Sequence, residues 1–535
     1  PSGPEGVFVL ALTAENTLLV ASVAPASNAE ALAARSALGD LPPTAAVELR
    51  LDGFVEAPAF SALRACFEGR KLIATVRSKA EGGVLPRTEE EERRFLEGAL
   101  AAGFDLADVE FRRDVGDRFA RIPPSKKISS LHDLEGIPAD LNTVATRMLS
   151  SGARYVKVVA TANDSGDARR LLELQAAHRE GRLATFGMGE AGICTRALAP
   201  YLGAALAYGS LLPGRGTAPG QVLALDLAET YGVGRPRKVS RLFGLFGVVV
   251  SHSLSPALHN ANFEAFDLDA LYAPFAMLML GKELESLVAS LDGLGLPLLG
   301  ASVTIPFKEE AALLSEAGEG GERAVNTLLR TSAPGHALRM RGKNTDRDAF
   351  EAVIEEASKE KKNEKGDARI ALVLGAGGTA RVAVDVLRKR GWDVFISNRT
   401  DAHGEELARA EGAHYLSKKS PVSFREASIL VNATPLGLRE GDPLPCEQSL
   451  LRPGMLVIDA PYRAEGTELV RVARAAGARV VDGQTLLLLQ AAGQATLFTG
   501  KRTTARELLA RLPSRVRASF SFFEDALHAL PEISA

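Results

Sequence analysis

The stretch Arg154-Tyr-Val-Lys-Val-Val-Ala-Thr161 places a lysine inside a run of apolar and β-branched residues. Its length and composition predict a fully buried strand, where an unpaired ammonium group would be costly. Lys157 therefore needs an acidic partner or a chemical reason to be there. One such reason is Schiff-base formation with a ketone, which requires a free amine and a pKa lowered by burial or nearby cations. The commoner alternative is a lysine near a strand end whose side chain snorkels to water.

Strand-like and helix-like segments alternate on both sides of this stretch, over about 230 residues. One helix is predicted from Thr88 to Ala102, with Gly103 as its stop. This rhythm and length are typical of a (β/α)8 barrel, in which the carboxyl ends of the strands meet on one face. Charged or imidazole side chains follow several of the predicted strands and are expected on that face: Glu48, Arg50, Arg77, Glu81, His132, Lys157 and Arg196.

Each of these side chains also has an ordinary explanation. An arginine at a strand end is most often part of a surface ion pair, and His132 followed by Asp133 could cap the next helix. Their joint occurrence favours a site, because several cations around a ketone-binding lysine lower its pKa. The planar guanidinium of arginine also suits a substrate carboxylate.

Residues 1 to about 236 resemble a type I 3-dehydroquinate dehydratase. The resemblance rests on motifs that follow in order: Glu48-Leu-Arg50, Arg77 with Glu81-Gly-Gly, His132-Asp133, Val156-Lys157, Thr195-Arg196 and Thr217-Ala-Pro-Gly-Gln221. It implies that Lys157 forms an imine with the substrate ketone, that His132 removes the α-proton and later protonates the departing hydroxyl, and that Glu81 orients the histidine. It also implies that Arg196 holds the substrate carboxylate. The other implied substrate contacts are Glu48, Arg50, Arg77, Thr217 and Gln221, and Thr217 stands where we expect serine.

A different set of motifs begins after residue 240. Ser251-His-Ser253-Leu-Ser255-Pro256 places two hydroxyls two residues apart before a helix that Pro256 could start, although an ordinary Ser/Pro helix cap is the alternative. Three more apolar runs end in Ser302-Val-Thr304-Ile-Pro306-Phe-Lys308, Ala324-Val-Asn326-Thr327 and Asn344-Thr-Asp346. Lys308 and Asp346 are candidates for an acid/base pair, with a structural salt bridge as the alternative.

The segment Ala371-Leu-Val-Leu-Gly375-Ala-Gly377-Gly378-Thr-Ala380 is a predicted strand that runs into a glycine turn and a helix. This is the context that the dinucleotide fingerprint requires, because glycines let the backbone approach a pyrophosphate at the helix N-terminus. The next predicted strand ends in Asn398-Arg399-Thr400, without an acidic residue to read the ribose. Arg399 suits a 2′-phosphate, so the pattern predicts NADP rather than NAD.

Residues of about 240 to 510 resemble shikimate dehydrogenase. The resemblance implies that Lys308 and Asp346 flank the reacting carbonyl. The implied substrate-binding residues are Ser253, Ser255, Thr304, Asn326, Tyr462 and Gln490. The implied NADP-binding residues are Gly375, Ala376, Gly377, Gly378, Asn398, Arg399, Thr400, Thr434 and Gly483. Three features depart from the family pattern: Ser302 stands where many relatives carry asparagine, Phe246-Gly-Val-Val lacks the usual G-x-P, and Arg347-Asp348 replace a common glycine.

The two resemblances describe consecutive reactions, as in the fused plant-type enzyme. The first half would make 3-dehydroshikimate, and the second would reduce it to shikimate. We therefore expect an α/β protein with an N-terminal (β/α)8 barrel over residues 1–236, followed by a two-lobed dehydrogenase. Its substrate lobe is expected at 240–345, completed by about 485–535, and its NADP-binding Rossmann lobe at 346–484.

The sequence is also compatible with two other functions. A dehydrogenase that prefers quinate is an alternative, because selectivity for a ring hydroxyl depends on pocket geometry. A non-catalytic quinate-pathway regulator is the other, and its expected mark is the loss of active-site residues. Lys157, His132, Lys308 and Asp346 are all present, which argues against the regulator.

Composition sets further limits. The 535 residues suffice for two or three cores, and a formal charge of −3 favours small-molecule partners over nucleic acid or membrane. Three cysteines without disulfide or metal-ligand spacing indicate a reducing cytoplasm and no metal. No apolar run is long enough to span a bilayer. The chain starts at Pro1 rather than methionine, so a removed targeting segment is an alternative to a cytoplasmic origin.

A charge-rich run and a C-terminal tail with several phenylalanines lie outside these motifs. Glu351 to Asp367 is expected to be a solvated helix and linker. The tail after Ser514, with Phe520, Phe522 and Phe523, is expected to be a packed terminal helix, with a contact to the barrel or to another subunit as the alternative.

Overall fold

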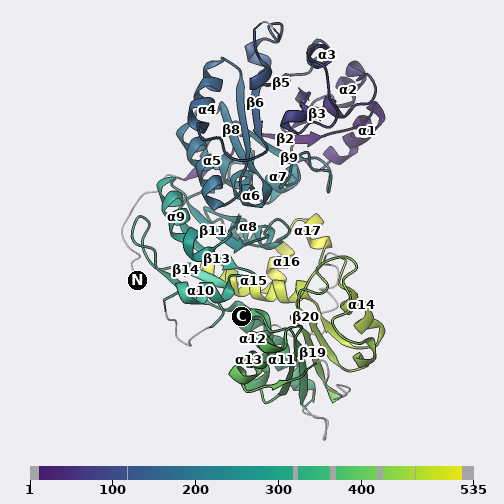
Figure 1. Ribbon diagram of the computed structural model, residues 1–535, viewed down its shortest axis with the longest axis vertical. Coiled ribbons are helices and arrows are strands. Elements are labelled where there is room, and N and C mark those ends of the chain that lie inside the picture. The colour runs from purple at the N-terminus through teal and green to yellow at the C-terminus, as the bar shows by residue number, and fades with distance from the viewer. Residues whose placement is uncertain are drawn as a thin grey trace. The chain divides into compact units, whose positions relative to one another are not determined.

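In the computed structural model, eight parallel strands form one sheet in the first part of the chain, in the order β8-β7-β6-β5-β4-β3-β2-β9 (Figure 1). Strands β2 to β8 are neighbours in chain order, and β9 returns to pair with β2. Just before β9, the amide of Ala205 donates to Leu183 O at 2.8 Å, so the two ends of the sheet also meet. The predicted (β/α)8 barrel is confirmed. Its strands are β2 Leu18–Val23, β3 Ala46–Arg50, β4 Leu72–Thr75, β5 Leu106–Glu110, β6 Lys127–Asp133, β7 Tyr155–Thr161, β8 Leu183–Met188 and β9 Leu206–Ser210.

The structure describes residues 11–116, 118–316, 323–361, 369–417, 426–463 and 465–520. The chain divides into two units. The first is Pro1–Pro256, Phe266–Phe307 and Arg330–Arg339, and the second is Ala257–Ala265, Lys308–Leu329 and Met340–Ala535.

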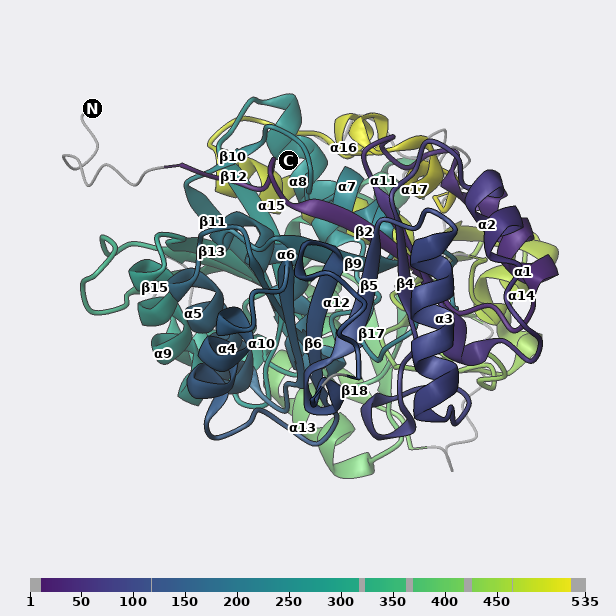
Figure 2. The same ribbon diagram turned by 90° about the horizontal axis from the view of Figure 1, so that it is seen from above.

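Helices follow the barrel strands, and Figure 2 shows α3 and α4 on the outside of the sheet. The predicted helix that starts after Thr88 is α3. Thr88 caps it, because its hydroxyl accepts from the amide of Glu91 and the Glu91 carboxylate accepts from the amide of Thr88. The barrel helices are α1 Asn28–Ala33, α2 Phe60–Cys66, α3 Glu89–Ala101, α4 Leu141–Ser150, α5 Ser165–Ala177, α6 Gly189–Leu198 and α7 Ala224–Glu229.

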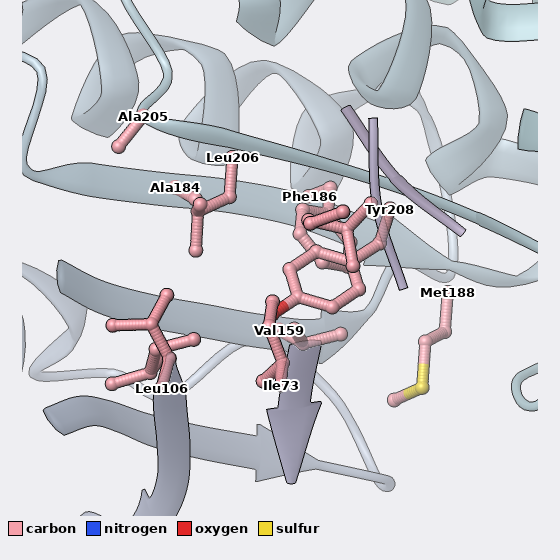
Figure 3. Close-up of a cluster of buried hydrophobic side chains, with 12 residues drawn as sticks. Ile73, Leu106, Val159, Ala184, Phe186, Met188, Ala205, Leu206 and Tyr208 are labelled. Carbon is pink, nitrogen blue, oxygen red and sulfur yellow. The ribbon is translucent and has the colours of Figure 1, made fainter. Parts of the chain in front are cut away.

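The inside of the barrel is filled by apolar side chains. Figure 3 shows the rings of Phe186 and Tyr208 side by side, with centroids 5.8 Å apart. Val20, Ile73, Ile128 and Val159 are among the buried residues that pack with them. The barrel is therefore a packed core rather than a pore, and a ligand site must lie at the strand ends.

The first unit continues beyond the barrel. Strand β11 (Arg241–Gly247) lies between the parallel strands β12 (Ala270–Ala276) and β13 (Leu298–Val303). Helix α9 (Leu280–Gly293) packs against α5, and β12 packs against α6. A short antiparallel pair, β1 (Leu12–Thr13) with β10 (Lys238–Val239), joins the chain start to the segment after the barrel.

The second unit contains a six-stranded parallel sheet in the order β18-β17-β16-β19-β20-β21. This is the doubly wound order of a dinucleotide-binding domain, whose ligand crevice lies where the order reverses, between β16 and β19. Its strands are β16 Ile370–Leu374, β17 Asp393–Ser397, β18 His414–Tyr415, β19 Ile429–Asn432, β20 Leu456–Asp459 and β21 Arg479–Val481, and its helices are α12 Gly378–Lys389, α13 Asp401–Glu411 and α14 Glu468–Ala475.

Helix α15 (Gly483–Thr499) is buried over most of its length and packs against α11 (Thr345–Lys361). The remaining elements are α8 Ser255–Ala265, which begins in the first unit, α10 Lys308–Leu314, β14 Thr327–Arg330, β15 Met340–Lys343, α16 Ala505–Arg511 and α17 Ser514–Ala518. No helix among the described residues is long and apolar enough to cross a membrane.

The structure describes part of the charge-rich run Glu351 to Asp367 and part of the tail after Ser514. Helix α11 covers the start of the charge-rich run, whose residues 362–367 lie outside the described part of the chain. Phe520 is buried just after α17, whereas Phe522 and Phe523 lie outside the described residues.

Candidate active sites

Lys157 lies in the middle of β7 and is only 3 % exposed, so it does not snorkel to water. Its Nζ is 2.5 Å from Asp108 Oδ2 and 3.7 Å from Glu48 Oε1, and it lies 4.5 Å from the ring centroid of Tyr208. Burial raises the pKa of Asp108, but Arg77 and then Lys157 outweigh burial and lower that pKa to about 2. Lys157 therefore has the acidic partner that its buried position requires, and sequence reasoning did not single that partner out.

Arg77 connects several carboxylates around this lysine. Its Nη2 is 2.9 Å from Asp108, and its Nη1 lies 3.3 Å from Glu110 and 3.4 Å from Glu81. Ser130 accepts from Arg77 at 2.9 Å and donates to Asp108 at 2.5 Å. Burial opposes the charge of Arg77, yet the carboxylates raise its pKa. The guanidinium is thus a fixed positive charge that holds three acids at the strand ends.

His132 is oriented by Glu81. The backbone amide of His132 donates to Glu81 Oε2, and its ring Nδ1 lies within hydrogen-bond distance of the same oxygen, both at 3.0 Å. Burial raises the pKa of Glu81 to about 7, against the opposing effect of Arg77. Burial, with the positive charges of Arg77 and Lys157, holds the pKa of His132 well below its usual value. The imidazole is therefore neutral at pH 7, and the tautomer with its proton on Nδ1 leaves Nε2 free to accept one.

Arg196, in α6, is a buried cation whose hydrogen-bonding capacity is only partly used. Its Nη1 donates to Tyr208 O at 3.4 Å, and its guanidinium lies 4.9 Å from the ring centroid of Phe186. Within the described part of the chain, its Nε and Nη2 have no partner. Burial lowers the pKa of Arg196 to about 10, within the range where it stays charged at neutral pH. Such a cation with unpaired donors fits an anionic ligand.

Glu48 and Arg50 lie on β3 and are both buried. Glu48 accepts from Ser22 at 2.6 Å and from Thr75 at 2.8 Å. Arg50 makes a two-pronged ion pair with Asp52, at 2.8 and 3.0 Å. The fork of Arg50 is thereby occupied by a neighbour that the sequence reasoning did not include.

Thr217 and Gln221 belong to a loop after β9. The amide of Thr217 donates to Gln221 Oε1 at 2.6 Å, and its hydroxyl donates to the same oxygen at 3.0 Å. The loop lines a cavity of about 620 Å³ whose other walls come from Ser210, Pro213, Gly214, Gly216, Ala218, Pro219, Gly220 and Leu223.

The second set of motifs starts within the first unit. The hydroxyl of Ser253 accepts from the amide of Ser255 at 3.2 Å, which fixes the spacing of the two serines. At Gly247, a Cβ would lie 2.5 Å from the methyl carbon of Thr304. The glycine of the departing Phe246-Gly-Val-Val segment is therefore required by close packing against Thr304.

Lys308 and Asp346 lie in the second unit and form an ion pair, with Nζ 2.5 Å from Oδ2 and each side chain 15 % exposed. Asn344 Oδ1 accepts from the amides of Asp346 at 3.1 Å and Arg347 at 3.3 Å, so it caps the start of α11. Arg347, which departs from the family pattern, forms an ion pair with Asp385 of α12. The departure thus has a structural role between two helices.

Asn326 and Gln490 are joined in a neutral hydrogen-bonded framework. Asn326 Nδ2 donates to Gln490 Oε1 and to Thr345 Oγ1, each at 3.0 Å. Gln494, one helical turn after Gln490, donates to Gln490 Oε1 at 3.2 Å. Thr345 and Gln494 were missed from the sequence because single polar residues in helices are common.

The glycine turn between β16 and α12 has the geometry that a dinucleotide needs. Gly375 has a φ of +111°, and a Cβ there would lie 2.7 Å from Ala433 O. Gly377 is the N-cap of α12, has no side-chain cap, and has open space where a Cβ would be. A Cβ on Gly378 would lie 3.7 Å from side-chain carbons of Lys308, so the turn passes beside that lysine. These residues fit a pyrophosphate on the helix N-terminus.

Arg399 is exposed at the end of β17, and Asn398 Nδ2 donates to Thr400 O at 2.9 Å. An exposed guanidinium beside this turn fits a 2′-phosphate.

Two further predicted cofactor residues follow other strands of the same sheet. The amide and hydroxyl of Thr434 donate to Asn432 Oδ1, while Asn432 Nδ2 donates to the buried Asp459 at 2.7 Å. A Cβ on Gly483 would lie 2.5 Å from Ala460 O, so that position requires glycine for packing. Tyr462 is half-buried in the segment after β20.

Comparisons with known proteins match both halves. A family model described as type I 3-dehydroquinase matches residues 24–236, and one described as the shikimate dehydrogenase substrate binding domain matches residues 245–328. The chloroplastic bifunctional 3-dehydroquinate dehydratase/shikimate dehydrogenase of Arabidopsis thaliana is 30 % identical over 480 residues, which cover 85 % of this chain and 77 % of the relative. The NADP(+) shikimate dehydrogenase of Rubrobacter xylanophilus is 41 % identical over 270 residues, covering 48 % of this chain and 90 % of the relative. A solved shikimate 5-dehydrogenase of Thermus thermophilus, in complex with NADP(H) and shikimate, is 30 % identical and covers 52 % of this chain and 99 % of its own, with a TM-score of 0.43.

Proposed function

The chain belongs to the family of bifunctional 3-dehydroquinate dehydratase/shikimate dehydrogenases, and from this premise we propose which of its residues carry each reaction. It is a lyase that converts 3-dehydroquinate to 3-dehydroshikimate and an NADP-dependent oxidoreductase that reduces that product to shikimate. The observation that carries the assignment of roles is the presence of two lysine–aspartate ion pairs in separate units, the buried pair Lys157–Asp108 and the partly exposed pair Lys308–Asp346.

Lys157 is the nucleophile of the dehydratase. Its amine adds to the ketone of 3-dehydroquinate, and loss of water gives an iminium that withdraws electrons from the adjacent carbon. His132 Nε2 takes the α-proton, and the resulting enamine expels the neighbouring hydroxyl, which leaves as water with the proton returned by His132. Hydrolysis of the imine then frees the product and Lys157.

Asp108 and Glu81 support these two groups without forming bonds to substrate. Asp108 is the acidic partner of Lys157, with its Oδ2 2.5 Å from Nζ. Glu81 keeps the His132 proton on Nδ1 and stabilises the imidazolium that forms when Nε2 is protonated. Arg196 binds the substrate carboxylate through its unpaired guanidinium donors.

In the dehydrogenase half, bound NADPH supplies the hydride. Gly375, Gly377 and Gly378 would hold its pyrophosphate, and the exposed Arg399 would hold its 2′-phosphate. Lys308 donates a proton from Nζ to the carbonyl oxygen as that oxygen becomes an alkoxide, and Asp346 fixes the position of Nζ. The side chains that we assign to the substrate hydroxyls and carboxylate are those of Ser253, Ser255, Thr304, Asn326, Tyr462 and Gln490.

We also propose the domain boundaries, the small-molecule partners and the cellular compartment. The proposed domains are the dehydratase barrel at 1–236, the substrate lobe at 240–345 with 485–535, and the NADP lobe at 346–484. The partners are the small molecules 3-dehydroquinate, 3-dehydroshikimate and shikimate. Cys66, Cys194 and Cys446 are all free thiols, which supports a reducing compartment such as the cytoplasm.

Borohydride trapping tests the covalent step. Reduction in the presence of substrate should attach the substrate carbon skeleton to Lys157, as located by peptide mass spectrometry, and Lys157→Ala should give no adduct. Lys127→Ala is the matched control, because Lys127 also pairs with an aspartate at 2.8 Å but begins β6 rather than lying at the site. An adduct on any other lysine would show that the nucleophile is misassigned.

A further inference from the structure

Glu190, a half-buried residue of the barrel, binds a turn that belongs to the dehydrogenase half. Its Oε2 accepts from the amides of Val250 at 3.1 Å and Ser251 at 3.3 Å, and its Oε1 accepts from the hydroxyl of Ser251. A single carboxylate thus satisfies three donors of two consecutive residues. Hydrogen bonds to an ionised carboxylate are about twice as strong as neutral ones.

The barrel holds Glu190 rigidly on its side of this contact. Glu190 lies in the first turn of α6, the helix that carries Arg196. The preceding residue, Gly189, has a φ of +78° and donates its amide to Pro219 O at 3.2 Å. A Cβ on Gly220 would lie 2.6 Å from Gly189 O. The start of α6 is therefore packed against the loop that contains Thr217 and Gln221.

On the other side, the bound turn leads directly into the serine motif. The amide of Ser253 donates to Val250 O at 3.2 Å, and the Ser253 hydroxyl accepts from Ser255. The residues just before the turn have little apolar packing, because Val248 and Val249 are 39 % and 59 % exposed. Val250, within the turn, is buried, so its packing and the three hydrogen bonds accepted by Glu190 together set the position from which the two serines emerge.

We propose that Glu190 is a positioning residue of the dehydrogenase reaction that the dehydratase barrel contributes. It holds Val250 and Ser251 so that Ser253 and Ser255 meet the substrate in place, and it does not touch the substrate itself. The inference rests on the proposed function, in which these two serines bind shikimate. The barrel then contributes to the dehydrogenase reaction in addition to catalysing the dehydratase reaction.

The test is the steady-state kinetics of shikimate oxidation by Glu190→Gln in the full chain. The KM for shikimate should rise roughly 3- to 30-fold, the range over which residues that act through a neighbour change affinity. The kcat and the KM for NADP should stay within about twofold, as expected for an interaction that binds ground state and transition state alike. Dehydratase activity should also stay within about twofold, which shows that the barrel is folded.

Glu173→Gln is the matched control. Glu173 also lies on a barrel helix and accepts from a serine of the dehydrogenase half, Ser290 of α9, at 2.9 Å, but α9 does not lead into the serine motif. It should leave the KM for shikimate at the parental value. Ser251→Ala provides a second route to the same measurement. The double variant Glu190→Gln/Ser251→Ala should have a KM for shikimate no higher than that of the more impaired single variant, because both changes break the same interaction.

Ser253→Ala separates this inference from the function on which it rests. If Ser253→Ala leaves the KM for shikimate unchanged, the serine motif does not bind substrate and the proposed function of these residues is wrong. If Ser253→Ala raises that KM while Glu190→Gln does not, the positioning role of Glu190 is wrong. Equal effects of Glu190→Gln and Glu173→Gln, or additive effects in the double variant, would also overturn it.

Discussion

The two lysines to which we assign chemistry lie in unlike surroundings. Lys157 is 3 % exposed and lies among acidic and basic side chains, with Asp108 and Glu48 within reach of its Nζ and Arg77 on the other carboxylate oxygen of Asp108. Lys308 is 15 % exposed at its side chain and pairs with Asp346 beside the glycine turn. The difference follows from the chemistry, because an imine needs an amine whose charge is controlled by the protein, whereas a bound cofactor brings its own hydride.

The same contrast extends to the residues around each lysine. At the barrel site, burial raises the pKa of Glu81, neighbouring cations lower that of Asp108 against the effect of burial, and burial and cations together lower that of His132. In the second unit, Asn326, Thr345 and Gln490 form a framework of neutral hydrogen bonds. The dehydratase half should therefore respond steeply to pH and to the loss of single charges, and the dehydrogenase half should respond mainly to the loss of one proton donor or one cofactor contact.

The largest effect is expected from Lys157→Ala. Removing the nucleophile should lower the dehydratase kcat by about 10⁴-fold or more, the scale seen when a covalent group is lost. NADP-linked shikimate oxidation should stay within about twofold of the parent, because it uses other residues. Both rates are measured on the same preparation, and a Lys157→Ala variant that retained a tenth of the parental dehydratase rate would rule out imine catalysis through this residue.

Lys308→Met and Asp346→Asn should have the next largest effect. Positioned acid/base groups contribute about 10²- to 10⁴-fold in rate, so each variant should lower the kcat for reduction of 3-dehydroshikimate by at least the bottom of that range. NADP affinity should change by no more than a few-fold, and dehydratase activity should be unaffected. Near-parental kcat with only a raised KM would make the residue a substrate binder rather than a proton donor.

Arg399→Ala addresses the cofactor. A charge-assisted pair with the 2′-phosphate is worth about 1.5–3 kcal/mol, so the variant should bind NADP roughly 10- to 150-fold more weakly and NAD almost as before. Binding of each cofactor is measured by titration calorimetry. Equal losses for NADP and NAD would show that Arg399 supports the fold of the turn instead of reading the phosphate.

The pH dependence of the dehydratase should show the Glu81 carboxyl. Its pKa is raised to about 7, and protonated Glu81 would donate to His132 Nδ1 and move the ring proton to Nε2, where the base is needed. The kcat/KM for 3-dehydroquinate should fall about tenfold per pH unit as the pH decreases below about 7. In Glu81→Gln this inflection should disappear from the neutral range and the rate should be lower. An unchanged inflection would assign it to another group.

Much of this contrast could be predicted from sequence because it lies in local patterns. A lysine in a buried strand, polar residues after successive strands and a glycine turn after a strand favour one interpretation when they occur together, and the structure places them on a barrel and on a doubly wound sheet. Asp108 was missed because an acid in the short strand Leu106–Glu110 looks like a surface residue until its neighbours are known. The signal available was the alternation of Asp108 and Glu110, which puts two carboxylates on one face of that strand.

Glu190 was missed for a different reason. An acidic residue in the first turn of a helix is common, because it interacts favourably with the helix dipole. Its three hydrogen bonds are made to residues 60 and 61 positions away in the chain, a separation that carries no local pattern. Long-range polar contacts of this kind were accessible only from the structure.

The most direct test of the account follows NADPH consumption with 3-dehydroquinate as the only substrate, for the parent, Lys157→Ala, Lys308→Met and an equimolar mixture of the two variants. If each lysine carries one of two consecutive reactions, the parent consumes NADPH in equimolar amount to 3-dehydroquinate, neither single variant does so, and the mixture recovers consumption because 3-dehydroshikimate passes through solution. Consumption by Lys157→Ala alone, or a mixture that stays inactive while both variants keep their other activity, would contradict the assignment of the two lysines to separate reactions.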